Sequence, residues 1–340
     1  MLRPVIMIAV FLTAVAAPEP LFARGTLERV QEEGLLRCGV IRSGIGVSDI
    51  DESGVWRGFF PDLCRAVAAA VTGDSEAVDF IEVNYVTRFE ALLDDAFDVL
   101  MTNTTWTASR DTELGLAFTQ PVFYDGQGFL AHRSLGATRL DELEAATVCV
   151  SEATTTIQTL EELIERRYPN LEPRPYESIE TVYDSFFARE CDLMTQGRVA
   201  LVSQHYSFAA DPEQFVLFPD VVSKEPLGPV VRAGEEDWFD AIQWTVFATI
   251  IAEEHGINAQ NVDVFRSSAN PEVKRLLGIE GAMGAKIGIR EDWAFQVIRQ
   301  VGSYDEIFAR NLGMDSPIGL ERGRNALWSV GGLIYAPPLR

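Results

Sequence analysis

The sequence predicts an α/β protein made of two similar units, each with a mostly parallel β-sheet. The first observation is that strand-like and helical segments alternate through the middle of the chain. The second is that this alternation comes in two cycles, one before Leu130 and one after Thr138. The third is the length, because 340 residues suffice for about two domains of ordinary size.

The elements follow from hydrophobic periodicity. The expected strands are short apolar runs at residues 36–40, 79–83, 99–102, 128–131, 147–150, 192–194 and 215–217. The expected helices between them have apolar residues at helical spacing, and the first is rich in alanine. These helices cover residues 60–71, 88–93, 157–167 and 181–187, and a long helix follows at 238–255.

Two segments, residues 129–133 and 221–227, stand where the chain would cross between the two units. We therefore expect the first unit to combine residues 24–130 with 226–270, and the second to contain residues 131–225. Further helices follow, and we expect residues 271–340 to form a C-terminal extension that packs on the first unit.

The first 23 residues have the pattern of a secretory signal peptide. Arg3 supplies a positive start, and residues 5–17 form an apolar run too short to span a bilayer comfortably. Small residues near positions 16 and 23 offer cleavage sites, so we expect cleavage within residues 16–24. An uncleaved anchor is the alternative. The pattern predicts an exported protein.

Export affects the interpretation of the four cysteines, because disulfides form in oxidising compartments. Four cysteines allow three pairings. The spacing favours Cys38–Cys64 and Cys149–Cys191, so that each bond would lie within one unit. Buried free thiols are an alternative. A zinc site is disfavoured, because the sequence contains no CxxC pair and its three histidines are scattered.

Charge and composition exclude several classes of protein. The chain has 28 Lys and Arg against 51 Asp and Glu, which gives a formal net charge of −23. Phosphate backbones would repel such a protein, so nucleic-acid binding is not expected. The 47% hydrophobic content is too high for a disordered chain. No GxSxG, HExxH, P-loop or GxGxxG motif is present, so we expect no catalytic residues, metal or cofactor.

The segment most informative about function follows the expected strand at 99–102. Small polar residues end this strand, and Arg110 lies in the next helical turn. Ligands of open α/β sheets bind at such strand ends, and Arg110 adds a planar group that matches a carboxylate. A second such turn, residues 151–156, follows the strand of Cys149. Two turns of this kind favour a binding site over an ordinary threonine-rich turn.

Several segments together carry a resemblance to a known family. They are residues 62–71, Asn103-Thr104-Thr105-Trp106-Thr107 with Ser109-Arg110-Asp111, residues 124–129, Val148-Cys149-Val150 with Thr154-Thr155-Thr156, and residues 223–229. The tail, with Trp293, Asn325-Ala326-Leu327-Trp328 and residues 335–338, fits as well. Over residues 25–340 the chain resembles the general L-amino-acid-binding periplasmic proteins of polar amino acid ABC importers, which are type-II solute-binding proteins of bacterial family 3.

The resemblance implies two α/β lobes joined by two crossover strands, which close on a ligand like a hinge, and a C-terminal helical extension. It implies a periplasmic monomer that captures a small carboxylate-bearing solute, either an amino acid or a related organic acid. This solute would pass to an inner-membrane permease. The resemblance also supports the two disulfides.

The ligand site can be carried over position by position. The residue that clamps the ligand carboxylate in the family falls on Arg110. Polar helpers fall on Thr102, Asn103 and Thr105 in the first lobe, and on Thr154 and Thr155 in the second. Gly197 stands where the family usually has an aspartate that pairs with the ligand ammonium, and Arg42 falls close to the same place.

An aspartate lost at Gly197 and an arginine gained at Arg42 would invert the local charge. This departure raises the hypothesis of an anionic ligand without a conventionally held ammonium, such as a dicarboxylate. Alternatively, Glu152, Asp125 or a water molecule takes the role of the missing acid.

Two other classes of protein stay open, because a fold does not fix a function. One is a dehydratase-like enzyme, with Glu152 as its acid. The other is a soluble sensory ligand-binding protein that signals to a membrane receptor.

Overall fold

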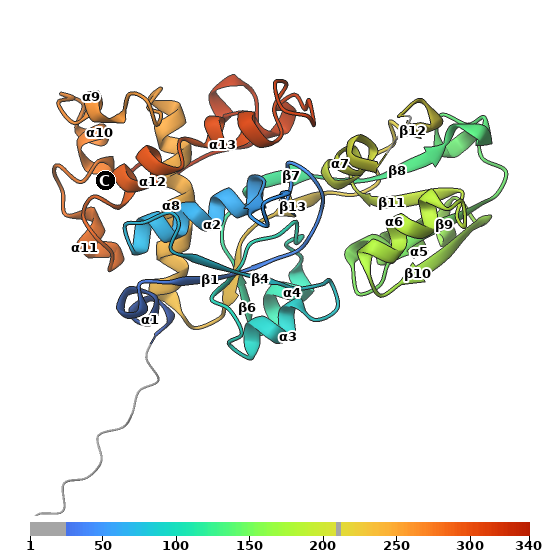
Figure 1. Cartoon of the computed structure of the whole chain (residues 1–340), viewed down its shortest axis with the longest axis horizontal. Helices are drawn as coiled ribbons and strands as arrows, with labels where there is room; N and C mark the ends of the chain where they lie inside the picture. The colour runs from blue at the N-terminus through green and yellow to red at the C-terminus, as the bar shows by residue number, and fades with distance from the viewer. Residues whose placement is uncertain (1–24, 209–211) are drawn as a thin grey trace, which may run out of the picture.

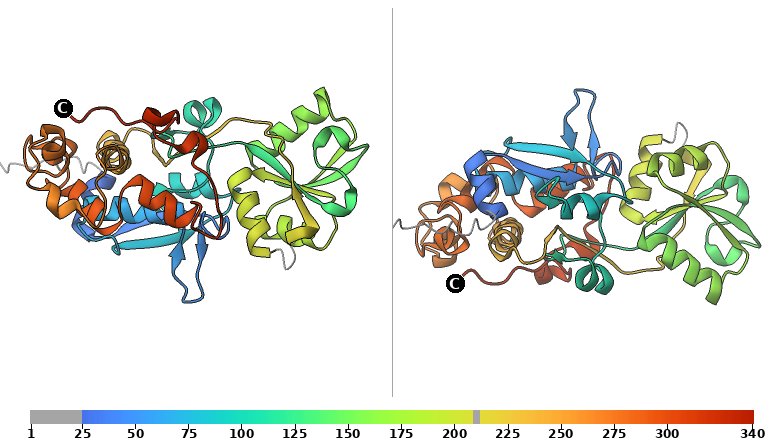
Figure 2. Two further views of the ribbon diagram at one scale, coloured as in Figure 1. Left: turned by 90° about the horizontal axis from the view of Figure 1, so that it is seen from above. Right: turned by 90° about the horizontal axis from the view of Figure 1, so that it is seen from below.

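The computed structural model describes residues 25–208 and 212–340. The predicted signal peptide and its cleavage site lie outside these residues. The chain forms two lobes side by side, each built on its own five-stranded sheet (Figure 1). Views from above and below show the same division (Figure 2). Within the described residues, no helix is both long and apolar enough to cross a membrane.

Lobe 1 contains the first sheet. Its strands, in spatial order, are β4 (Val78–Glu82), β1 (Leu36–Val40), β5 (Val99–Leu100), β14 (Val230–Arg232) and β6 (Leu116–Phe118). β1 pairs in parallel with β4 and β5, and β14 runs antiparallel to both of its neighbours. A small hairpin, β2 (Asp49–Ile50) and β3 (Trp56–Arg57), projects from this lobe.

Lobe 2 repeats this arrangement. Its strands are β10 (Leu171–Tyr176), β9 (Ala146–Ser151), β11 (Leu193–Gly197), β8 (Gln127–His132) and β12 (Phe215–Leu217). β9 pairs in parallel with β10 and β11, and β8 is the single reversed strand. Each sheet is thus mostly parallel, as the sequence predicts.

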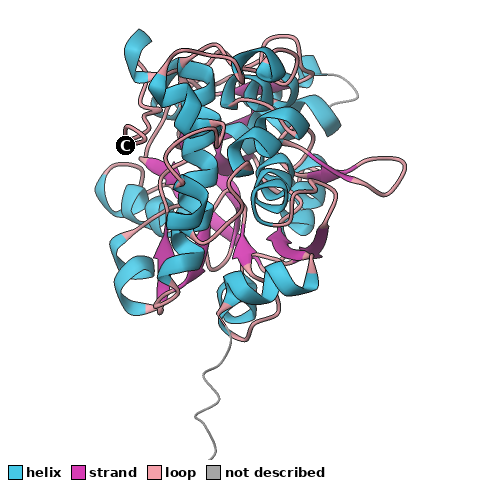
Figure 3. Cartoon of the chain, turned by 90° about the vertical axis from the view of Figure 1, so that its left-hand side faces the viewer, coloured by secondary structure: helices cyan, strands magenta, loops and turns pink. Residues whose placement is uncertain are grey.

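Helices pack around the strands (Figure 3). Lobe 1 carries α1 (Thr26–Glu33), α2 (Phe59–Val71), α3 (Arg88–Leu93), α4 (Ala108–Glu113) and α8 (Glu236–Glu254). Lobe 2 carries α5 (Thr155–Arg166), α6 (Ile179–Phe187) and α7 (Arg198–Phe208). The alanine-rich face of α2 is buried, because small side chains let this helix pack closely on its neighbours.

The C-terminal part is helical. It contains α9 (Val262–Phe265), α10 (Pro271–Leu276), α11 (Met283–Ile287), α12 (Trp293–Gln300) and α13 (Tyr304–Asn311). α12 and α13 pack against α2 and α8 of lobe 1. Short 3-10 helices occur at Arg133–Leu135, Leu140–Glu142, Pro212–Gln214, Gly323–Asn325 and Trp328–Val330.

A separate two-stranded sheet joins the lobes. β7 (Phe123–Asp125) pairs antiparallel with β13 (Glu225–Leu227), and Glu225 lies directly opposite Asp125. The C-terminal part reaches this hinge, since Asn325 Oδ1 accepts a hydrogen bond from Tyr124 N–H at 2.7 Å. The two strands lie between the lobes in Figure 1.

The first connection from lobe 1 to lobe 2 comes earlier in the chain than the sequence predicts. Residues 129–133 were expected to connect the units, but β8 is a fully buried strand of lobe 2. β11 and β12 pair with its two edges and α7 packs against it, so this strand lies inside lobe 2. The chain crosses at β7 instead. The expected boundary at residue 130 therefore falls inside β8, and the other expected limits of the lobes and the extension stay a prediction.

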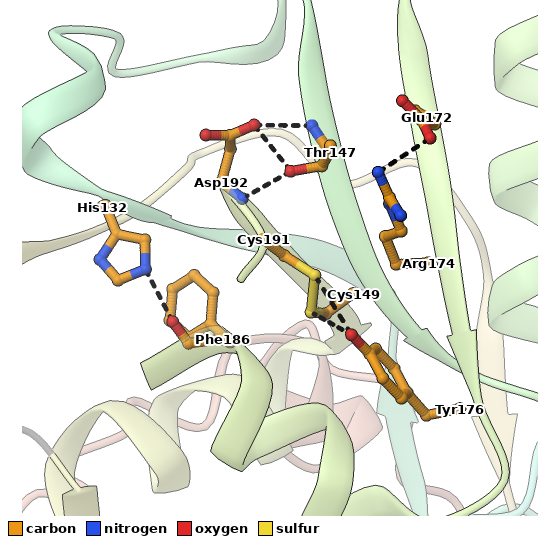
Figure 4. The surroundings of a disulfide bond; sticks show 9 residues. All are labelled: His132, Thr147, Cys149, Glu172, Arg174, Tyr176, Phe186, Cys191 and Asp192. Atoms are coloured by element: carbon orange, nitrogen blue, oxygen red, sulfur yellow. Dashed lines mark hydrogen bonds and ion pairs between the residues drawn. A yellow bond between two sulfur atoms is a disulfide. The ribbon is translucent and has the colours of Figure 1, made fainter. Parts of the chain in front are cut away.

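Both disulfides join the cysteines that the spacing pairs. Cys38 bonds to Cys64 across 26 residues in lobe 1, and Cys149 bonds to Cys191 across 42 residues in lobe 2. The second bond links the neighbouring strands β9 and β11, beside the Tyr176 hydroxyl (Figure 4). On the same two strands, Asp192 accepts hydrogen bonds from the N–H and hydroxyl of Thr147 at 2.8 and 2.7 Å. The pairing prediction is therefore confirmed.

Candidate ligand-binding site

A cavity lies between the lobes beside the hinge. Lobe 1 contributes Tyr85, Arg88, Asn103, Thr104, Thr105 and Arg110 to its wall. The hinge contributes Asp125, Glu225 and Leu227, and lobe 2 contributes Ser151, Thr154, Thr155, Thr156, Thr195, Gln196 and Gly197. The wall is mainly polar, and its charges belong to two arginines and two carboxylates.

Arg110 is held by the turn that precedes α4. The side chain of Thr107 caps this helix by accepting a hydrogen bond from Arg110 N–H at 3.4 Å. The guanidinium donates to the carbonyl of Thr105 at 2.8 Å, and the residue is only 9% exposed. Burial lowers the pKa of Arg110 to about 10, although the negative charge of Glu225 opposes this effect. Arg110 therefore stays positive at neutral pH and has donors left for a ligand.

Arg88 is a second guanidinium in the same wall. It begins α3, is 1% exposed, and lies 4.3 Å from the centre of the Phe89 ring. The guanidinium of Arg110 lies 5.3 Å from the same ring, so the two positive groups are neighbours. Burial and the charge of Arg110 lower the pKa of Arg88 to about 9. The lobe 1 wall is thus strongly positive at neutral pH.

The hinge supplies the negative charges. Asp125 and Glu225 are cross-strand neighbours in the antiparallel pair of β7 and β13. Burial raises the pKa of Asp125 to about 6. Burial, together with the nearby charge of Asp125, raises the pKa of Glu225 to about 8. Like charges at opposing positions repel each other, so this pair favours a bound cation or a retained proton.

Both carboxylates fill the space beside Gly197. A Cβ atom placed on Gly197 would lie 2.7 Å from Asp125 Oδ2 and 3.1 Å from Glu225 Oε2. A larger side chain would therefore collide with the acids unless they moved. The resemblance implies an aspartate at position 197 in the family, and in this protein two hinge acids lie beside that position.

Lobe 2 offers neutral groups. Thr154 caps α5, since its hydroxyl accepts a hydrogen bond from Ile157 N–H at 3.3 Å. The cap leaves other N–H groups of the first turn directed toward the cavity end of the helix, where anions are favoured. Thr195 is fixed by donating to Gly128 O at 2.7 Å and accepting from Gln127 Nε2 at 2.9 Å.

Hydrogen bonds join the lobes directly around the cavity. Gln196 of lobe 2 donates from Nε2 to the Tyr85 hydroxyl of lobe 1 at 3.1 Å, and Asn103 Nδ2 donates to the same oxygen at 3.0 Å. Further out, the Ser203 hydroxyl donates to Ile45 O at 2.7 Å. The structure therefore has the lobes closed on each other.

Six of the residues expected at the site line the cavity: Asn103, Thr105, Arg110, Thr154, Thr155 and Gly197. The side chain of Thr102 lies behind the wall, where its hydroxyl shares a 2.6 Å hydrogen bond with Thr104. Glu152, the acid considered for a dehydratase, is not among the lining residues.

Arg42 lies outside the cavity. Its guanidinium pairs with Asp49 at 3.2 Å, and 46% of its side chain is exposed. The reason is local, because the chain turns back through residues 43–48 and brings this carboxylate within reach. Arg42 therefore adds no positive charge to the cavity, and two acids lie beside Gly197. The hypothesis of a ligand without an ammonium group loses the support of Arg42, while Gly197 itself still carries no carboxylate.

Sequence reasoning did not assign a role to Tyr85, Arg88, Glu225 or Gln196, and it treated Asp125 only as a substitute acid. Asp125 and Glu225 both lie in segments that carry the resemblance, so their position was visible. The signal that was missing is the register of β7 against β13, which brings together residues 100 positions apart.

Two lobes that enclose a charged cavity at a hinge define a solute-binding protein of the two-lobed class. Residues 36–271 match the bacterial extracellular solute-binding proteins, family 3. The chain belongs to this family.

Several relatives are similar along nearly the whole chain. The general L-amino acid-binding periplasmic protein AapJ of Rhizobium johnstonii is 42% identical over 317 residues, which is 93% of each protein. The glutamate/glutamine/aspartate/asparagine-binding protein BztA of Rhodobacter capsulatus is 43% identical over 318 residues, again 93% of each. A periplasmic binding protein of an ABC transporter from Brucella ovis, solved with glutathione bound, is 40% identical. It superposes with a TM-score of 0.91 over 93% of this chain and all of the other.

Proposed function

We propose that this protein is the periplasmic solute-binding component of an ABC importer, and that it binds an amino acid through both of its charged groups. The observation that carries the proposal is the pairing of buried charges of opposite sign around one cavity. Arg110 comes from lobe 1, and Asp125 and Glu225 come from the hinge. This arrangement is complementary to a zwitterion.

In the proposed complex, Arg110 donates hydrogen bonds to the ligand α-carboxylate. The N–H groups at the start of α5 and the hydroxyl of Thr105 add neutral donors to the same anion. The α-ammonium lies between Asp125 and Glu225, where it replaces the repulsion of two carboxylates with two attractions. A dicarboxylate without an amine would leave this acidic pair uncompensated.

Closure of the two lobes on a ligand follows from how the binding groups are distributed between lobe 1, the hinge and lobe 2. Arg110 and the hinge acids are available to a ligand while the lobes are apart, whereas the hydroxyl and N–H groups of lobe 2 reach it only after closure. Contacts made only in the closed form favour that form, so ligand binding stabilises closure. The hydrogen bond between Gln196 and Tyr85 supports the closed form in the same direction.

The relatives support the transport role over the alternatives. AapJ and BztA are named as amino-acid-binding proteins, and the Brucella ovis protein was solved with a small peptide that carries an α-amino acid group. We therefore infer delivery to an inner-membrane permease, with no covalent change to the ligand. One chain builds the whole cavity, so we expect a monomer to bind.

The test is calorimetric titration of protein that has been unfolded, dialysed and refolded to remove bound ligand. L-glutamate and L-glutamine are compared with glutarate, which matches the glutamate skeleton but lacks the amine. We expect micromolar or tighter binding of at least one amino acid and none of glutarate. Binding of glutarate with no binding of any L-amino acid would contradict the proposal.

A further inference from the structure

Asn325 binds the hinge strand β7 in the way that a neighbouring strand would. Its side-chain amide accepts a hydrogen bond from Tyr124 N–H at 2.7 Å and donates one to Tyr124 O at 3.2 Å. A side-chain amide carries a donor and an acceptor like those of a peptide group, so it can satisfy both backbone groups of one residue. Asn325 is only 6% exposed and does not line the ligand cavity, so the proposed function gives it no role.

The partner strand β13 cannot supply both of these hydrogen bonds. Pro226 lies opposite Tyr124 and has no N–H group to donate. The carbonyl of Pro226 accepts a hydrogen bond from Trp106 N–H at 2.9 Å. Asn325 therefore supplies the donor that proline lacks, and the C-terminal part completes the pairing of β7.

A second side chain of the C-terminal part holds the same stretch of chain. The hydroxyl of Tyr304, which begins α13 and is fully buried, donates to Val122 O at 2.7 Å. Val122 lies two residues before Tyr124, so the C-terminal part holds this connection at two points. The next residue along the chain is Asp125, which belongs to the wall of the ligand cavity.

The tail segment, residues 320–325, is itself fixed to lobe 1. Arg322 pairs with Glu253 of α8 at 3.2 Å and with Asp305 of α13 at 2.8 Å. Its Nε donates to Asn325 O at 2.8 Å, and its guanidinium lies over two aromatic rings of α13. Asn325 is thus attached to a firm support and can fix β7 relative to lobe 1.

A groove separates the tail segment from lobe 2. Residues 320–325 form one side of this groove, and Arg198, Val199 and Val202 of α7 form the other, with residues 123–126 between them. The tail segment therefore holds the lobe 1 end of β7 while leaving space beside lobe 2. Movement of lobe 2 would then begin beyond the part of β7 that the tail segment holds.

We propose that the C-terminal part fixes the hinge strand β7, and that Asn325 is a positioning residue that places Asp125 against the cavity. This proposal rests on the proposed function, which assigns the ligand ammonium to the hinge acids. A strand that is ordered before the ligand arrives lowers the entropy lost on binding. Asn325 therefore increases the affinity for the ligand without touching it.

A purely structural role for Asn325 makes a different prediction. If its hydrogen bonds only stabilised the fold, their loss would lower the melting temperature of the protein. The affinity of the folded protein for its ligand, and the rate at which the ligand dissociates, would stay the same. A positioning role changes both of these quantities.

The experiment compares wild type with Asn325→Leu, each prepared without bound ligand by refolding. Calorimetry with L-glutamate and L-glutamine measures affinity, and stopped-flow tryptophan fluorescence measures dissociation. We expect Asn325→Leu to bind about 3- to 10-fold more weakly, which corresponds to one net hydrogen bond. The factor should be the same for both amino acids, because they share the ammonium group. Most of the change should appear as faster dissociation.

Gln300→Leu is the matched control, because Gln300 of α12 also binds the backbone of lobe 1 through a side-chain amide. It accepts a hydrogen bond from Ser75 N–H and donates one to Gly73 O, both at 2.9 Å. None of these three residues lines the ligand cavity. Gln300→Leu should lower the melting temperature but keep the affinity and the dissociation rate of wild type.

Tyr304→Phe is a second, milder variant, since it removes only the hydroxyl that binds Val122. It should weaken affinity for both amino acids by a smaller factor than Asn325→Leu does. All binding is measured at a temperature where thermal melting shows the variants to be folded.

Unchanged affinity and dissociation in Asn325→Leu would overturn the proposal. If that variant does not fold, unchanged values in Tyr304→Phe would overturn it instead. An equally large change in Gln300→Leu would also contradict it, because the effect would then not depend on the hinge. If wild type binds no L-amino acid, the proposed function fails and this proposal with it, and that result differs from a loss confined to the variants.

Discussion

Lobe 1 and lobe 2 share a sheet arrangement but not a binding chemistry. Each has three parallel strands followed by a reversed strand, and each contains one disulfide. Yet lobe 1 and the hinge supply every charged group of the cavity wall, whereas lobe 2 supplies only hydroxyl, amide and backbone groups. With the same sheet arrangement, lobe 1 and the hinge therefore recognise the charges of the ligand, and lobe 2 stabilises the closed form.

This difference has a physical reason. Charged groups act over longer distances than neutral hydrogen bonds do, so they can select a ligand before the lobes meet. Neutral donors act only at contact, so the neutral groups of lobe 2 bind the ligand only after the lobes have closed. The comparison predicts that changes in lobe 1 or the hinge alter which ligand binds, and that changes in lobe 2 alter how firmly the closed form is held.

The largest effect on binding is expected for Arg110→Ala. Removing the carboxylate partner should weaken amino acid binding at least about 100-fold, because a buried hydrogen-bonded charge pair contributes about 2–5 kcal/mol when one partner is lost. The melting temperature of the unliganded protein should change little, since the variant also removes a buried positive charge. Calorimetry and thermal melting measure the two quantities. Affinity that survives this change would show that Arg110 is not the anchor.

Removing the disulfide of lobe 2 should reduce the stability of the protein without changing its selectivity between ligands. Replacing Cys149 and Cys191 together by alanine opens a loop of 42 residues, which loop-closure entropy values at about 4 kcal/mol. Denaturant unfolding should show a loss of this size, while the ratio of glutamate to glutamine affinity stays the same. A changed ratio would mean that lobe 2 takes part in selecting the ligand.

The hinge acids should make binding depend on pH. The pKa values of Asp125 and Glu225 are raised to about 6 and about 8, and the ligand ammonium needs both groups ionised. Affinity should therefore fall as pH drops through this window. Glu225→Gln should weaken binding by about tenfold at high pH, which corresponds to one charged hydrogen bond, and should flatten the upper part of the pH profile.

The stability of the unliganded protein should follow pH in the opposite sense. Because both pKa values lie above their unfolded values, the folded state holds more protons than the unfolded state within this window. The stabilisation is complete at acidic pH and is lost as pH rises through about 6 and then about 8. Melting curves of the ligand-free protein measure this, and a melting temperature that rises over the window would contradict the burial of these acids.

The smallest effect is expected for Thr154→Ala in lobe 2. This change removes the side-chain cap of α5 and should lower the free energy of unfolding by about 1 kcal/mol. Amino acid affinity should weaken by less than about tenfold, equally for acidic and neutral ligands, because the N–H groups of the helix remain. A loss as large as that of Arg110→Ala would reverse the assignment of the two lobes.

Much of the framework was predictable from the sequence because local patterns specify it. Apolar runs marked β1 and β12 at their observed limits, and helical spacing marked α3 at its observed limits. The turns that carry Arg110 and Thr154 were predictable for the same reason, since polar residues follow apolar strands there. Cysteine spacing within each unit was sufficient to favour the observed pairs.

The rest depends on contacts between distant segments. Asp125 and Glu225 form a pair only because β7 and β13 align, and neither residue is unusual in a chain this acidic. Arg88 begins a short helix, where an arginine would ordinarily be solvated. Here its guanidinium packs on the rings of Tyr85 and Phe89 and donates to the carbonyl of Ala153 in lobe 2. For Arg42, the resemblance suggested a place near the ligand ammonium, but the nearby Asp49 pairs with its side chain instead.

The most direct test of the account is mass spectrometry of the ligand that co-purifies with the protein, released by denaturation from wild type and from Arg110→Ala. We predict that wild type releases, chemically unchanged, a small molecule with a primary amine and at least one carboxylate, and that Arg110→Ala releases little of it. A ligand without an amine would contradict the central claim that the arginine wall of lobe 1 and the acidic hinge together bind a zwitterion.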